Sequence, residues 1–166
     1  MPQDVRQRFE QILEHNRRRM AAIARSYAAP EDQEDLFQEM LLQIWKSLGS
    51  FEGRAALDTW IYRVALNTAI TYRRKTLERR QHVEHPGELP EPKAHLSQNQ
   101  AAPGRELRIL EEFIRTLNKI DRAVFLLYLE DLSYRQISEI TGLTENHVGV
   151  RLSRIKRSYM ETHFGA

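Results

Sequence analysis

The residues with the clearest chemical potential lie near the carboxyl end of the chain, where Val148, Leu152 and Ile155 form the apolar stripe of an expected helix. Six side chains lie off this stripe and are free to reach a partner: Glu145, Asn146, His147, Val150, Arg151 and Arg154. A carboxylate can accept from cytosine, an amide can bond adenine, and a guanidinium can reach guanine or phosphate. Four bases and no acid between residues 151 and 157 add attraction for a polyanion. This face therefore suits DNA.

The residues that precede this last helix have the sequence features of a helix-turn-helix. Ser133 and Gln136 fit a capping box, residues 141–143 read as a tight turn with a central glycine, and Thr144 can cap the last helix. The second helix of such a motif enters the major groove with its amino end first. Gly149 is expected to leave room for close backbone approach. The alternative is an ordinary helical hairpin with a solvated charged face.

A second constellation lies in the amino-terminal half. Residues 57–67 interleave aromatic side chains with Arg and Asn, and residues 73–80 contain five bases and one acid. This mixture suits stacking on unpaired bases beside phosphate contacts. The preceding loop, residues 50–54, could line a pocket for an extruded base. The alternative is that Trp60 and Ile61 simply belong to the core.

An acidic stretch stands apart from both basic segments. Residues 31–39 contain five acids and no base, which would repel phosphate and attract a basic protein. A helix start with acids that match the dipole accounts for Glu31 and Asp32. It accounts less well for Asp35 and Glu39, which lie one and two turns further along. We therefore expect a protein partner at this face.

Apolar residues recur every three or four positions along most of the chain, which predicts an all-α fold. The expected helices cover residues 5–27, 30–48, 57 into the basic segment, 107–117, 121–128, 133–140 and 144–159. Asp121 is the expected cap of the fifth of these helices, and Gly49 the residue that follows the second.

Residues 81–104 break this pattern, because they contain four of the six prolines and few large apolar residues. We interpret them as a flexible linker between two small helical domains, residues 1–80 and 105–166. A flexible chain of about 24 residues spans roughly 27 Å on average and about 80 Å when fully extended.

Composition excludes several classes of protein. The 166 residues are 41% hydrophobic and 29% charged, with a net charge of +2, and the mean hydropathy is −0.60. These values are typical of a soluble globular protein without membrane insertion, for which the cytoplasm is the simplest home. The lack of cysteine excludes disulfides, Cys-ligated metals and thiol catalysis.

An enzyme is not expected. The six histidines are scattered, and His82 and His85 beside Glu84 make only a weak metal site. No glycine-rich phosphate loop is present. We therefore expect no catalytic residue, cofactor or metal.

Two ordered sets of motifs resemble the sigma-70 family. DLFQE at residues 35–39, FEGR at 51–54 and TWIYRVALN at 59–67 resemble region 2, and FLLYLEDLSY at 125–134 with the helix-turn-helix resembles region 4. Regions 1 and 3 are missing. The chain is therefore similar to a two-domain extracytoplasmic-function (ECF) sigma factor.

The resemblance implies three surfaces and a function in promoter-specific transcription initiation. The acidic helix would dock on the β′ clamp helices of core polymerase through Asp32, Asp35, Gln38 and Glu39. The β subunit of core polymerase would also contact the factor. The loop and the third helix would melt and read the −10 element by Phe51, Arg54, Trp60, Arg63, Asn67, Arg73 and Arg74. The last helix would read the −35 element by Thr144, Glu145, Asn146, His147, Arg151 and Arg154. The chain departs from the family at Gly149 and Val150, where Lys or Ser is frequent.

The resemblance also bears on partners and on arrangement. An anti-sigma factor is a possible partner. The two DNA elements would lie about 70 Å apart, roughly two turns of B-DNA, so we expect the free chain to be packed or mobile rather than extended. The alternative function is a stand-alone helix-turn-helix repressor, which would dimerise on DNA and leave the acidic helix unexplained. A pure interaction module without DNA affinity is a third reading.

Overall fold

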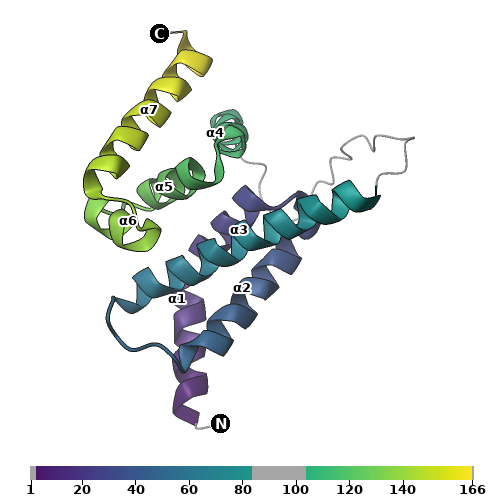
Figure 1. The fold of residues 1–166 in the computed structure, drawn as a ribbon, viewed down its shortest axis with the longest axis vertical. Coiled ribbons are helices and arrows are strands. Elements are labelled where there is room, and N and C mark those ends of the chain that lie inside the picture. Colours follow the sequence, from purple (N-terminus) through teal and green to yellow (C-terminus); the bar gives the residue numbers. More distant parts are fainter. Residues whose placement is uncertain (1–2, 84–103, 166) are drawn as a thin grey trace.

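The computed structural model describes residues 3–83 and 104–165, and within these ranges the secondary structure is helical (Figure 1). The elements are α1 (Gln3–Tyr27), the short 3-10 turn η1 (Pro30–Asp32), α2 (Gln33–Leu48), α3 (Leu57–Val83), α4 (Arg105–Thr116), α5 (Lys119–Leu129), α6 (Tyr134–Thr141) and α7 (Glu145–Phe164). The predicted all-α class is confirmed.

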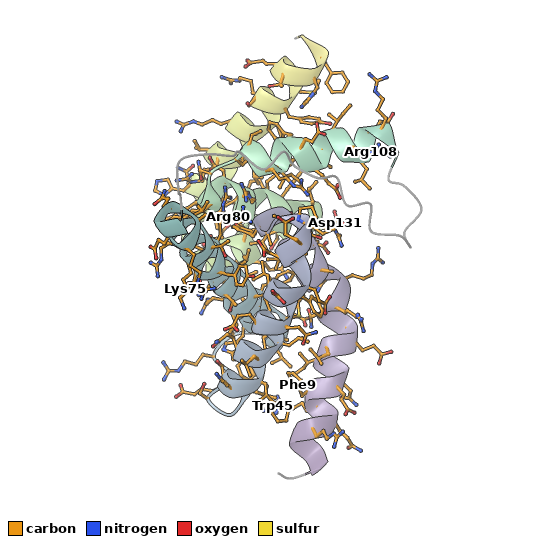
Figure 2. The ribbon with its side chains drawn as sticks, turned by 90° about the vertical axis from the view of Figure 1, so that its right-hand side faces the viewer. Phe9, Trp45, Lys75, Arg80, Arg108 and Asp131 are labelled. Carbon is orange, nitrogen blue, oxygen red and sulfur yellow. The ribbon has the colours of Figure 1, made fainter. Side chains whose placement is uncertain are left out.

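The first unit packs α1, α2 and α3 against one another. Helix α2 buries Leu36, Met40, Ile44 and Leu48, which are spaced one turn apart and therefore form a single stripe. Near the amino end of α1, the Phe9 ring packs edge-on against the Trp45 ring of α2, with the ring centroids 4.8 Å apart (Figure 2). This core buries one side of α3, whereas Arg63, Asn67 and Arg74 on that helix are exposed.

The second unit is built around α5, which packs against α4, α6 and α7. Six consecutive side chains of α5, residues 122–127, are buried. Helix α7 buries Val148, Leu152 and Ile155, so the predicted apolar stripe is confirmed. Tyr159 extends the same stripe onto the Phe113 ring of α4, with centroids 5.0 Å apart.

Two of the three expected helix caps are confirmed. The Ser133 hydroxyl accepts from the Gln136 amide at 3.2 Å in a complete capping box, and the Thr144 hydroxyl accepts from the His147 amide at 3.2 Å. Gly142, with φ of 78°, makes the left-handed turn between α6 and α7. These local bonds fix where α7 begins.

The expected cap at Asp121 is wrong. Asn118 caps α5, because its side-chain oxygen accepts from the amides of Ile120 and Asp121 at 3.1 and 2.9 Å. Asp121 therefore stands inside the first turn, where its carboxylate is available for other contacts.

The end of α3 also differs from the prediction. The helix continues to Val83, three residues into the segment predicted as linker. Residues 84–103 of the predicted linker, including Glu84, His85 and the four prolines, lie outside the described residues.

The two units contact each other, with α1 against α4 and α5, and α3 against α6 (Figure 1). The Tyr27 hydroxyl donates to the Lys119 carbonyl at 2.8 Å, and Arg122 donates to the Ser26 carbonyl at 2.7 Å. Arg19 of α1 lies 3.4 Å from the carboxylate of Glu130. The structure therefore has the packed arrangement rather than an extended one.

Candidate nucleic-acid and protein-binding interfaces

The exposed side of α7 carries an open hollow of about 530 Å³. One wall is Tyr134 from α6, and the remaining lining residues come from α7: Glu145, Asn146, Gly149, Val150, Ser153, Arg154 and Arg157. We call this surface the α7 hollow. It brings together three of the predicted base readers, Glu145, Asn146 and Arg154, on the side of the helix opposite the buried stripe.

The sequence prediction missed three residues of the hollow: Tyr134, Ser153 and Arg157. The signal for two of them was present, since Gly149, Ser153 and Arg157 recur every four residues, as Asn146, Val150 and Arg154 do. The position of Tyr134 follows only from the angle between α6 and α7.

Arg151 does not line the α7 hollow. Its guanidinium donates to the Asp121 carboxylate of α5 at 2.6 Å, and the two side chains are 35% and 21% exposed. The other oxygen of that carboxylate accepts from the Asn118 amide at 2.6 Å. Asn118, Asp121 and Arg151 thus tie α7 to the first turn of α5.

Gly149 of α7 lies against the Tyr134 ring of α6. A Cβ atom added there would lie 3.3 Å from the Tyr134 ring. The missing side chain therefore gives room to that ring, and the close approach of a DNA backbone stays a prediction. Thr144 and His147 stand at the amino end of α7, where Thr144 caps the helix and both residues are exposed.

The predicted −10 residues lie on the loop before α3 and along α3 itself. The Phe51 and Trp60 rings are tilted against each other with centroids 5.3 Å apart, and Trp60 is half-buried. Arg54 is exposed and pairs with Glu52 at 2.6 Å. Ile61 is buried, so the core interpretation of that residue is confirmed.

Further along α3, the predicted residues face different surroundings. Asn67 is exposed, Arg73 is half-buried, and exposed Arg74 lies 4.0 Å from Glu78. Arg63 donates to the Glu139 carbonyl of α6. One predicted DNA contact is therefore engaged by the second unit in the packed arrangement.

The acidic stretch is partly neutralised by the basic one. Arg80, near the end of α3, lies 3.2 Å from the Asp32 carboxylate and 3.6 Å from that of Glu31. Asp35 and Gln38 are exposed on α2, whereas Glu39 is half-buried and accepts from Gln43 at 2.7 Å. Of the three acids predicted to bind core polymerase, Asp32, Asp35 and Glu39, Asp35 is the exposed one.

The contact between the units contains two perturbed ionisable groups. Burial, with a smaller contribution from the charge of Arg73, lowers the pKa of Arg122 to about 10, so the guanidinium stays charged at neutral pH. Burial raises the pKa of Tyr27, which Arg122 only partly offsets. The guanidinium carbon lies 5.1 Å from the centre of the Tyr27 ring.

Two kinds of site are not found in the described part of the chain. Residues 3–83 and 104–165 contain no helix long and apolar enough to cross a membrane. The same residues contain no cluster of His, Asp or Glu suited to a metal ion.

A capped helix-turn-helix with a polar hollow on its second helix, beside a separate helical unit, defines a DNA-binding transcription regulator. The family model of sigma-70 region 2 matches residues 12–80, and that of sigma-70 region 4 matches residues 107–158. The chain belongs to the sigma-70 family and is an ECF sigma factor.

Curated relatives agree with this assignment. The ECF RNA polymerase sigma-E factor of Haemophilus influenzae is 29% identical, over 90% of this chain and 82% of that protein. The RNA polymerase sigma factor NccH of Alcaligenes xylosoxydans is 25% identical, over 89% and 82% of the two chains. The factor SigG of Mycobacterium tuberculosis is 40% identical, but over 34% of this chain and only 15% of that protein.

Two solved structures share the fold. Sigma factor RpoE of Bartonella quintana, in complex with the anti-sigma factor NepR, matches with a TM-score of 0.70 at 22% identity, over 92% of this chain and 94% of that one. CnrH, in complex with the cytosolic domain of CnrY, matches with a TM-score of 0.68 at 19% identity, over 95% and 88%.

Proposed function

We propose that this ECF sigma factor makes core RNA polymerase specific for promoters through three surfaces. Its domains are residues 1–80 for core and −10 binding, 81–104 as a spacer, and 105–166 for −35 binding. The observation that carries the proposal is the α7 hollow on a capped helix-turn-helix, with an exposed acid-bearing helix on a separate unit.

The α7 hollow reads the −35 element in this proposal. Asn146 and Arg154 present an amide and a guanidinium, which suit bidentate contact with adenine and guanine. Glu145 suits a cytosine amino group. Thr144 and His147 lie beside the nearest phosphates at the amino end of α7, and Arg151 positions the helix through Asp121.

The loop before α3 and α3 itself bind the −10 element. Phe51 and Trp60 offer aromatic faces for an unstacked base, while exposed Arg54, Asn67 and Arg74 lie along the path of the strand. Arg63 and half-buried Arg73 join this set once the second unit has moved away from α3.

Core polymerase binds the acidic side of α2 through its β′ clamp helices. Asp35, Gln38 and Glu39 supply that surface, and Asp32 contributes mainly by its ion pair with Arg80. The second unit contacts the β subunit. The protein acts in the cytoplasm, has no catalytic residue or cofactor of its own, and is open to control by an anti-sigma factor.

Run-off transcription with core enzyme on genomic fragments tests the proposal. Specific transcripts that require both the chain and core support it. DNA-bound dimers that form without core, and no co-elution with core in gel filtration, would favour the repressor. Lack of DNA affinity at any salt concentration, with and without core, would leave only an interaction module.

A further inference from the structure

An apolar patch lies in the middle of the otherwise polar α7 hollow. Val150 and Tyr134 are each 41% exposed there, on either side of Gly149. Apart from Gly149, the other lining residues carry polar or charged side chains: Glu145, Asn146, Ser153, Arg154 and Arg157. A valine gains nothing from water, so an apolar group of a partner that covered Val150 at this position would stabilise the complex.

The patch is placed between two side chains suited to bases. Asn146, Val150 and Arg154 follow one another at four-residue spacing along the exposed side of α7. Four residues correspond to a rise of about 6 Å, which is close to two base-pair steps of about 3.4 Å. A duplex that meets Asn146 and Arg154 therefore also meets Val150.

The major groove offers one apolar group to such a residue. Base edges there display hydrogen-bond donors and acceptors, and the C5-methyl group of thymine is the exception. A valine against any other base edge would bury an acceptor or donor without a partner, which disfavours that base. A valine against thymine buries methyl against methyl.

We infer that Val150 is a specificity-determining residue that reads the C5-methyl group of one thymine in the upstream promoter element, between the base pairs contacted by Asn146 and Arg154. This inference rests on the proposed function of α7.

The test removes only the methyl group. Holoenzyme assembled from the full chain and core is bound to a promoter fragment identified by run-off transcription. Each thymine of the upstream element, on either strand, is replaced in turn by deoxyuracil. We expect about a fourfold loss of affinity at one position, the worth of one buried methyl group, and little change elsewhere.

Variants connect that position to Val150. In Val150→Ala the ratio of the affinities for thymine and deoxyuracil at the sensitive position falls from about four toward one, because the shorter side chain buries less of the methyl group. Alanine is a better helix former at this exposed site, so folding is retained. Met160→Ala is the matched control, because Met160 is also an exposed apolar residue of α7 but lies outside the hollow, and it keeps the fourfold ratio.

Three results would overturn the inference: no sensitive thymine, no thymine in the element, or a sensitivity that Val150→Ala leaves unchanged. In each of these the holoenzyme still binds and transcribes its promoter, so the proposed function stands. Failure of the proposed function has a separate signature, because then no fragment gives a transcript that depends on the chain.

Discussion

The contact between the two units should restrain promoter binding by the free protein. It holds Arg63 of α3 against α6 and keeps the two units together. In the proposed function the units must separate, because the −10 and −35 elements would lie about 70 Å apart. Arg122 is the most buried cation of this contact, at 2% exposure. It also donates to two carbonyls of its own unit, so its removal would damage that unit and would not isolate the contact.

Tyr27 and Glu130 allow a cleaner perturbation. Tyr27→Phe removes the bond to the Lys119 carbonyl, worth about 1 kcal/mol. Glu130→Arg replaces a partly exposed ion pair with Arg19 by repulsion, which costs about 1 kcal/mol. Together the changes should favour the open arrangement by about 2 kcal/mol, or roughly 30-fold.

The assay is a distance between two labels. The chain has no cysteine, so Thr71→Cys on α3 and Ser158→Cys on α7 provide unique labelling sites on exposed residues. We expect the double variant without core to show longer distances and tighter promoter binding than the parent. Core enzyme should lengthen the distance in the parent as well.

The matched control is Glu112→Arg, a charge reversal at an exposed position of α4, which should change neither distance nor binding. Two results would refute the reasoning. One is the same long distance in the parent with and without core. The other is a double variant whose distance and DNA binding equal those of the parent.

Three further predictions concern the surfaces themselves. Asp35→Arg with Glu39→Arg should weaken core binding in a pull-down by several kcal/mol and leave −35 binding intact, because acids that face a basic partner matter most when desolvated; unchanged core affinity would remove this assignment. Arg154→Ala should cost about 1–3 kcal/mol of binding free energy, confined to one base pair of the element. Arg151→Ala should instead lower the melting temperature of the protein and weaken its binding to all DNA sequences alike. A loss of affinity confined to one base pair in Arg151→Ala would restore that residue as a base reader. Burial raises the pKa of Tyr27, so the stability that its neutral phenol gives to the packed state is complete below about pH 10 and is lost as the pH rises further. Ultraviolet titration should show one fewer ionisation-resistant phenol in Tyr27→Phe than in the parent. An unchanged titration curve would contradict the burial of Tyr27.

Local signals predicted the helix-turn-helix well. The capping box at Ser133, the glycine turn at Gly142 and the cap at Thr144 depend on residues within four positions of one another, so they can be read along the chain. The same kind of reasoning failed at Asp121. Both Asn118 and Asp121 are residue types that favour the N-cap position. The choice between them depends on the backbone before α5, because the N-cap residue has an extended conformation and Asn118 is the residue that adopts it.

Periodicity and composition by themselves determined the helices, the buried stripes and the separation into two units. Only the tertiary structure decided which charges remain available. Asp32 meets Arg80 across 48 positions, and Asp121 meets Arg151 across 30. Each pairing depends on how helices rotate and cross when their apolar stripes pack, and the spacing of residues along one helix carries no information about the neighbour that its polar side will face.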